Sequence, residues 1–209
     1  MSEPPHPRER EVTLRDGRTV TLRPICPEDA EPLQAGLQRL SPESRYRRFL
    51  SPIARFSSAQ LRYMTDVDHH DHEALVAIAP RGELVGVARS IRARPGDSAA
   101  EAAVVVADDW QRLGLGKALL AHLADRAREE GVGRFTAVLL SDNTDMLELF
   151  EDLGSVRTLR RDPGTIEIEI ELPGHGVGPL LDELLRGSAG DRYDFLPTAP
   201  PPSGAPGPV

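Results

Sequence analysis

The spacing of apolar residues along the chain switches between a period of two and a helical period, and each switch predicts an element. Residues 12–23 alternate on both sides of Asp16-Gly17. This pattern predicts a β-hairpin with a two-residue turn, in which both turn positions need positive φ. Apolar residues at helical spacing predict a helix after Pro27. Two more helices are expected, one from Ser41-Pro42 and one from Ser57, where a capping-box pattern begins.

The chain from there to Pro173 alternates strands with helices. Strand periodicity marks residues 73–79, 84–91, 100–107, 135–140, 156–160 and 165–172, and helical periodicity marks 115–130 and 143–153. A set of strands followed by a strand–helix–strand–helix unit indicates an α/β or α+β layer fold.

These patterns place one folded domain over residues 11–173. Residues 1–10 are polar and Pro-rich, and we expect them to form a disordered lead. After Pro173 the periodicity decays, so residues 174–209 are expected to be a tail with a short helix followed by Pro- and Gly-rich disorder. A chain of 209 residues is long enough for one such domain with a sizeable core.

Composition narrows the classes of function. A formal net charge of -8 argues against non-specific nucleic-acid binding and favours a cationic partner such as an amine. No apolar run is long enough for a membrane span, and the first residues lack the apolar core of a signal peptide. We therefore expect a cytoplasmic protein with no membrane partner, and Cys26, the single cysteine, permits no intrachain disulfide. The oligomeric state stays open.

The junction between the strand 100–107 and the helix 115–130 carries Gln111-x-x-Gly114-x-Gly116. Glycines let a backbone approach a ligand closely, and a helix N-terminus offers free N–H donors and a positive dipole end. Arg112 and Lys117 add charge, so the loop suits a pyrophosphate. It matches neither the dinucleotide fingerprint nor the nucleotide P-loop. The alternative is an ordinary helix N-terminus that binds no ligand and happens to contain glycines.

The loop resembles the (Gln/Arg)-x-x-Gly-x-(Gly/Ala) signature of the GNAT acetyltransferase superfamily, and the resemblance extends over about residues 12–173. The segments Leu22-Arg23-Pro24 and 40–49, with Leu-Ser-Pro-Glu-Ser-Arg-Tyr-x-Arg-Phe, resemble its bacterial protein-lysine acetyltransferase (Pat-like) branch. The resemblance implies a GNAT fold with a mixed central sheet of about six to seven strands, flanked by about four to five helices. It also implies acetyl-CoA as cosubstrate and no metal.

The resemblance assigns the cofactor contacts to a strand, the loop and one asparagine. Val104 and Val106 would pair with the pantetheine arm through their backbones, as an added strand would. Asn143 would contact the cofactor or act as a plain helix N-cap, and both roles are compatible. The predicted cofactor-binding residues are Val104, Val105, Val106, Gln111, Arg112, Leu113, Gly114, Leu115, Gly116, Lys117 and Asn143.

Acyl transfer to an amine needs a proton acceptor, because a lysine amine is mostly protonated at pH 7. Ala100-Glu101 matches the context in which Pat-like proteins carry their general base, so Glu101 is the predicted base; the alternative is a solvent-facing strand glutamate. The backbone N–H of Val104 or a neighbour would stabilise the oxyanion. Many GNAT enzymes have a tyrosine seven residues after the asparagine, where this chain has Phe150, which cannot donate a proton.

The expected reaction is direct attack of an amine on acetyl-CoA in a ternary complex. By resemblance the acceptor is a protein lysine, and a small-molecule amine is the alternative. Other classes of function stay open. A non-catalytic acyl-CoA-binding module would keep the loop without turnover, and Phe150 favours it, whereas Glu101 does not. A scaffold that uses the Pro-rich tail is a third possibility.

Two charged clusters have open roles. His69, His70 and His72 lie in an acidic segment that looks like a metal site, but their spacing matches no established ligand pattern, so we expect a solvated or substrate-edge loop. A proton-relay role for His72 stays open. Arg45, Arg47 and Arg48 form a basic turn, which is either plain surface charge or a contact for an acidic group of the substrate.

Overall fold

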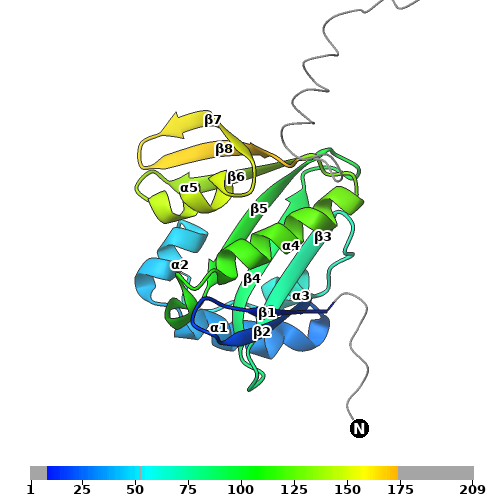
Figure 1. Cartoon of the computed structure of the whole chain (residues 1–209), viewed down its shortest axis with the longest axis vertical. Coiled ribbons are helices and arrows are strands. Elements are labelled where there is room, and N and C mark those ends of the chain that lie inside the picture. The colour runs from blue at the N-terminus through cyan, green and yellow to red at the C-terminus, as the bar shows by residue number, and fades with distance from the viewer. Residues whose placement is uncertain (1–8, 52, 174–209) are drawn as a thin grey trace, which may run out of the picture. The chain divides into compact units, whose positions relative to one another are not determined.

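The computed structural model describes residues 9–51 and 53–173, which form one eight-stranded sheet in the order β1-β2-β3-β4-β5-β6-β8-β7 (Figure 1). All neighbouring strands are antiparallel except β5 and β6, which are parallel. The strands are β1 (Arg10–Thr13), β2 (Thr19–Pro24), β3 (His72–Ile78), β4 (Leu84–Arg92), β5 (Ala99–Val106), β6 (Arg134–Leu140), β7 (Ser155–Asp162) and β8 (Thr165–Glu171).

Five α-helices and two 3-10 turns cover the two faces of the sheet within the described residues. They are η1 (Pro27–Asp29), α1 (Ala30–Arg39), α2 (Pro42–Phe49), α3 (Ser58–Thr65), η2 (Asp108–Trp110), α4 (Leu115–Glu129) and α5 (Thr144–Glu151). The predicted α/β layer fold is confirmed. The sheet has one strand more than the upper end of the range that the resemblance implied. Its edge strand β1 is the first arm of the predicted N-terminal hairpin and pairs with β2.

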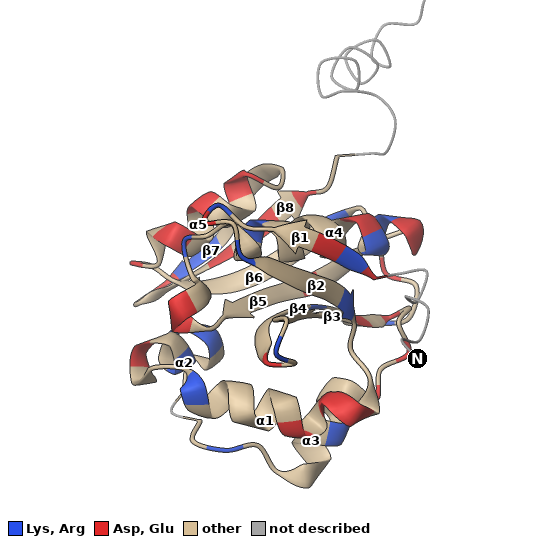
Figure 2. Ribbon diagram, turned by 60° about the horizontal axis from the view of Figure 1, so that its bottom comes forward, with Lys and Arg blue, Asp and Glu red and all other residues tan. Residues whose placement is uncertain are grey.

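The two faces have separate hydrophobic cores. Leu119 and Leu123 of α4 pack on one face with Val104 of β5. Leu33 and Leu37 of α1 belong to the core on the other face, and Val105 of β5 packs against that core. Figure 2 shows α1 and α3 on the side of the sheet opposite to α4. Since side chains alternate along a strand, Glu101 lies on the face of Val105, the face that α1, α2 and α3 cover.

The N-terminal hairpin differs from its prediction in its turn. Leu14 donates to the carbonyl of Arg18 and Gly17 donates to that of Leu14, so three residues, not two, form the loop. Gly17 has φ +86, whereas Asp16 does not have positive φ. The expected two-residue turn with two positive φ angles is therefore wrong. One glycine suffices here because a tight turn followed by a left-handed residue also closes a hairpin.

The feature that positions the candidate site is an opening between β5 and β6. The two strands pair only from Ala99 to Glu101, opposite residues 134–136, although β5 continues to Val106 and β6 to Leu140. Beyond Glu101 the edge of β5 that faces β6 has no strand partner. Residues 1–8, 52 and 174–209 lie outside the described residues, and so does the predicted tail helix. Within the described part, no helix is long and apolar enough to cross a membrane.

Candidate active site

The loop between β5 and α4 is shaped by its two glycines in different ways. Gly114 is the N-cap of α4 and has φ +91, a conformation that favours glycine, while the neighbouring Arg112 also has positive φ. A Cβ on Gly116 would lie 3.1 Å from a methyl group of Leu149, so this glycine lets α4 approach α5 closely. The first amides of a helix have no partner within that helix, so an anion at the N-terminus of α4 would meet unpaired N–H donors.

Gln111 and Asp108 hold this loop in place. The Gln111 side-chain amide donates to the carbonyl of Val106 at 3.0 Å and to a carboxylate oxygen of Asp108 at 3.2 Å. Asp108 also accepts from the backbone of Ser41, at 2.7 Å, and from the hydroxyl of Ser44. Burial tends to raise the pKa of Asp108, but the hydrogen bonds from Ser44 and Ser41 outweigh it, so the pKa lies below its usual value. The loop is therefore tied to the start of α2.

The turn of the N-terminal hairpin lies against the other side of the loop. The backbone of Arg15 donates to the carbonyl of Leu113 at 3.1 Å, and the Arg18 guanidinium lies 4.1 Å from the centre of the Trp110 ring. The Arg15 side chain comes within 3.9 Å of the point where a Cβ on Gly114 would lie. The sequence offered no signal for this residue, because nothing local to residues 12–18 points to a loop so far along the chain.

Two other cations at the loop already have carboxylate partners. Arg112 forms an exposed ion pair with Asp145, and Lys117 forms one with Asp152, each at 3.1 Å. Exposed pairs of this kind contribute little to stability, so both cations are free to exchange their partner for a phosphate at low cost.

The opening between β5 and β6 exposes specific backbone groups. Ala107 donates to the carbonyl of Val85 on β4, so the backbone groups of odd-numbered β5 residues face β4. By the same alternation, those of Val104 and Val106 face the opening. The Val106 carbonyl is taken by Gln111. The Val104 N–H and C=O and the Val106 N–H thus point into the gap beyond the last β5–β6 pair, where an extended ligand with amide groups could add as a strand does.

Glu101 lies where this gap closes. It is the last β5 residue paired with β6, opposite Thr136, and its side chain is exposed on the face covered by α1–α3. Its pairing with Ile91 places it near the end of β4. A carboxylate at the closed end of the gap can accept a proton from a group that approaches from the α1–α3 face.

Arg89 of β4 and His72 of β3 lie on the same face of the sheet as Glu101. Arg89 donates to the carbonyl of Met64 at 2.7 Å and to Nε2 of His72. Burial, and then the neighbouring Arg89 cation, lower the pKa of His72 to about 4. His72 is therefore neutral at pH 7, with Nε2 as acceptor and its proton on Nδ1. So low a pKa makes it a weak base, which disfavours a proton-relay role.

A model of the Acetyltransferase (GNAT) family matches residues 40–154, which include the whole loop, the opening and Glu101. This chain belongs to the GNAT acetyltransferase family.

Similar proteins place this GNAT chain in the Pat-like branch. Acetyltransferase Pat of Mycolicibacterium smegmatis is 35% identical over 83% of the chain, and acetyltransferase PA5475 of Pseudomonas aeruginosa is 40% identical over 72%. The chain spans 52% of the first relative and 81% of the second. The crystal structure of the GNAT domain of S. lividans PAT is also similar, with 36% sequence identity and a TM-score of 0.74. The match covers 81% of this chain and 100% of that domain. The chain is thus an acyltransferase with the GNAT fold.

Asn143 and Phe150 lie on α5, next to the GNAT loop. Asn143 is the N-cap residue of α5 and is buried, but its side chain makes no capping hydrogen bond. The N-cap position is therefore confirmed without the usual capping contact, and a cofactor contact stays a prediction. Phe150 is 1% exposed and packs in the core, so this position supplies no proton donor.

The histidine segment does not converge on one point. His69 contacts the buried carboxylate of Glu73 at 2.7 Å, His70 contacts Glu130, and His72 accepts from Arg89. Within residues 9–51 and 53–173, no group of three metal-ligating side chains is placed to hold an ion. The structure gives these histidines three separate polar partners.

Proposed function

We propose that this chain transfers an acetyl group from acetyl-CoA to a primary amine, with a protein lysine as the acceptor, by direct attack in a ternary complex. The observation that carries the proposal is the separation of β5 from β6 directly after Glu101, with a free backbone edge that leads to the Gly114 loop. The Pat-like membership of the chain supports a lysine as the acceptor.

The cofactor would run along this edge. The amides at the start of α4 would bind the pyrophosphate, with Arg112 and Lys117 as supporting cations. The two amide groups of the pantetheine arm match the free groups of Val104 and Val106 as an added strand would. This path brings the thioester to the closed end of the gap, next to Glu101.

The acceptor would arrive from the face that α1, α2 and α3 cover. Its ammonium group loses a proton to Glu101, directly or through water, and the free amine attacks the thioester carbonyl carbon. The C–N bond forms, the C–S bond breaks, coenzyme A leaves as a thiolate, and the nitrogen loses its second proton to solvent. The Val104 N–H would stabilise the oxyanion. Because Phe150 cannot donate a proton, solvent would protonate the thiolate.

The test compares the chain with Glu101→Gln, which removes the base and keeps the size of the side chain. We expect Glu101→Gln to bind acetyl-CoA with unchanged affinity and to lose about 10²- to 10⁴-fold in kcat with a lysine peptide. Calorimetry measures the binding and release of free thiol measures turnover.

A matched control is Glu11→Gln, another exposed strand glutamate, on the far edge strand β1. It should leave both quantities unchanged. If Glu101→Gln and the parent chain have the same turnover rate, Glu101 is not the general base. If both proteins bind acetyl-CoA but neither releases thiol with any amine tested, the result would instead favour the non-catalytic acyl-CoA-binding module.

A further inference from the structure

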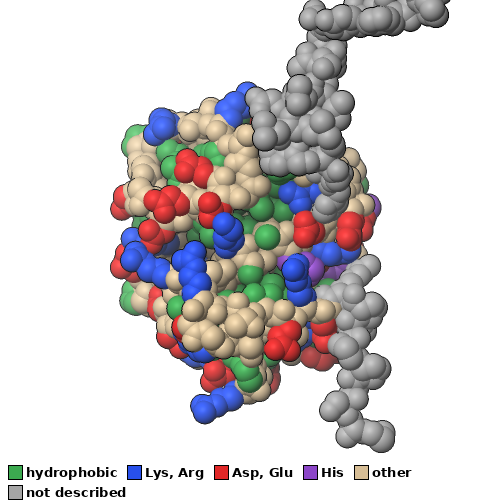
Figure 3. Space-filling view, in the orientation of Figure 1, with side chains coloured by type: hydrophobic (Ala, Val, Ile, Leu, Met, Phe, Trp, Pro, Cys, Tyr) green, Lys and Arg blue, Asp and Glu red, His purple; other side chains and the backbone are tan. Residues whose placement is uncertain are grey.

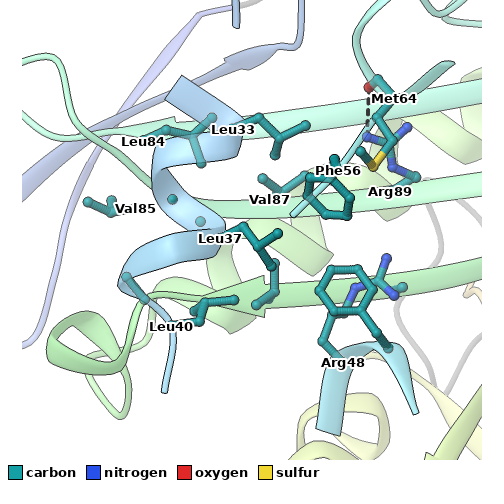
Figure 4. Close-up of a pocket in the computed structure, with 16 residues that line it drawn as sticks. Leu33, Leu37, Leu40, Arg48, Phe56, Met64, Leu84, Val85, Val87 and Arg89 are labelled. Atoms are coloured by element: carbon teal, nitrogen blue, oxygen red, sulfur yellow. Dashed lines mark hydrogen bonds between the residues drawn. The ribbon is translucent and has the colours of Figure 1, made fainter. Parts of the chain in front are cut away.

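Two arginines from different elements lie at one cavity on the acceptor face. Arg48 of α2 and Arg89 of β4 both line a cavity of about 50 Å³ beneath α1, whose other walls are mostly apolar. Figure 4 shows both arginines away from the end of the cavity that Leu84 and Val85 form. That volume holds no more than a few water molecules, so the cavity by itself does not accommodate a large ligand.

The strand register places these arginines near the proposed base. Arg89 pairs with Ala103 and Ile91 pairs with Glu101, so all four side chains share one face of the sheet. Arg89 and Glu101 are diagonal neighbours on that face, within reach of long side chains. Arg48 of α2 lines the same cavity as Arg89 and Ala103, and its charge interacts with that of Glu101.

Neither of these two arginines forms an ion pair with a carboxylate within the described residues. The partners of Arg89 are a carbonyl oxygen and the neutral ring of His72, neither of which carries a negative charge. Burial, and then repulsion by Arg48, lower the pKa of Arg89 to about 10. Burial also lowers the pKa of Arg48, which only attraction to Glu101 opposes. One exposed carboxylate therefore faces two partly desolvated cations.

The neighbours of Arg48 in the basic turn behave differently. Arg45 donates to the carbonyls of Leu40 and Gln38, and Arg47 forms an ion pair with Glu43 at 2.7 Å. Within the described part of the chain, Arg48 has a cation–π contact with Phe49 and no hydrogen bond or ion pair. Of the two roles that the sequence left open for this turn, surface charge thus fits Arg45 and Arg47 but not Arg48.

We propose that Arg48 and Arg89 form an anion subsite that binds a carboxylate of the acceptor next to its reactive amine. The inference rests on the proposed function and specifies its acceptor. Holding two cations out of water without a matching anion is costly, and a carboxylate accepts strong hydrogen bonds from guanidinium groups. The carboxylate has two possible sources: an acidic side chain that flanks the target lysine, or the α-carboxylate of a free amino acid.

The experiment uses two acceptor pairs that differ in one charge. The first pair is a lysine peptide flanked on both sides by glutamate and the same peptide flanked by glutamine. The second pair is free lysine and its methyl ester. We expect a kcat/KM about tenfold or more higher for the charged member of one pair, mainly through KM. The pair that shows the preference identifies the source of the carboxylate.

Variants of the basic turn link the preference to this subsite. Arg48→Met should abolish the preference while acetyl-CoA affinity is unchanged, and Arg48→Lys should restore part of it. Arg47→Met, the adjacent arginine with its own ion pair, should keep the preference in full. Unchanged acetyl-CoA affinity also shows that each variant is folded.

Equal kcat/KM within both pairs for the parent chain would overturn the subsite and leave the proposed function intact. A preference that persists in Arg48→Met would overturn it as well. If the parent chain binds acetyl-CoA but acetylates none of the four acceptors and no other amine, the proposed function fails, and the subsite fails with it.

Discussion

Glu101 is the last β5 residue that pairs with β6, and its side chain is exposed on the face that α1, α2 and α3 cover. One residue earlier, Ala100 faces the α4 core, and from Ala102 onward β5 no longer pairs with β6. A carboxylate elsewhere on this strand would lie in the core or away from the closed end of the gap. The arrangement supports Glu101 as the group that receives the acceptor proton.

Gly114 is the residue at which the loop depends most on backbone freedom. It has φ +91, and no atom lies closer than 3.9 Å to the point that a Cβ would occupy, so a side chain there would be strained and yet would fit the available space. We expect Gly114→Ala to cost about 1 kcal/mol in stability and to weaken acetyl-CoA binding about tenfold or more, because the loop amides turn away from the pyrophosphate. Thermal unfolding and calorimetry measure the two effects.

Gly82 is a matched control for that prediction. It has φ +82 in the turn between β3 and β4, and a Cβ there would meet nothing within 4 Å. Gly82→Ala should therefore destabilise the fold by a similar amount and leave cofactor affinity unchanged. Equal loss of affinity in both variants would mean that Gly114 acts through general stability and not through the loop.

At the scale of elements, the N-terminal hairpin adds a cation to a loop far along the chain. Arg15 is exposed beside Gly114, while Arg112 and Lys117 already have carboxylate partners. We expect Arg15→Ala to weaken acetyl-CoA binding about three- to tenfold at low salt, with a smaller loss at high salt, because an exposed cation–phosphate contact is screened. Calorimetry at two salt concentrations measures this.

Arg10→Ala is the control for this cation, since Arg10 is an exposed arginine at the start of the same hairpin. It should leave the affinity and its salt dependence unchanged. If Arg15→Ala and Arg10→Ala behave alike, the hairpin supports the loop through its backbone contact to Leu113 alone.

The helix α2 connects the two halves of the candidate site. Its N-cap Ser41 and its Ser44 hold Asp108 next to the loop, and its last turn carries Arg48 to the acceptor face. A shift of α2 would therefore move the cofactor loop and the acceptor side together. Such a link between the two substrates fits a ternary complex, in which both must be in place at once.

Much of this arrangement follows from local sequence signals. The strands and helices after Glu73 follow from periodicity, and the loop follows from Gly114 and Gly116, because helix N-termini and positive φ are local constraints. The roles of Arg15, Arg48 and Arg89 do not, because each depends on a contact between segments far apart in the chain. The motif likewise did not reveal that the Gln111 side chain closes the loop onto Val106.

At the scale of the whole molecule, side chains of both charges are present, with 25 Lys and Arg and 33 Asp and Glu. Figure 3 shows positive and negative side chains interspersed on one face, with no extended region of a single sign. The formal net charge of -8 favours the approach of a cationic amine. The arginines Arg48 and Arg89 would act at short range, where they would select acceptors that also carry a carboxylate.

In the proposed complex, the sheet would separate the two substrates. The cofactor would occupy the opening between β5 and β6, starting at α4, and the acceptor would come from the face of α1, α2 and α3. The two would meet at Glu101, the last β5 residue that pairs with β6. The central claim is therefore that acetyl-CoA binds along the free edge of β5.

Hydrogen exchange of the β5 amides with and without acetyl-CoA tests this claim most directly. The N–H groups of Val104 and Val106 face the opening, whereas that of Val105 faces β4, so Val105 serves as an internal reference. We predict that saturating acetyl-CoA slows exchange at Val104 and Val106 at least about tenfold more than at Val105. Saturated binding with unchanged exchange at Val104 and Val106 would contradict the account.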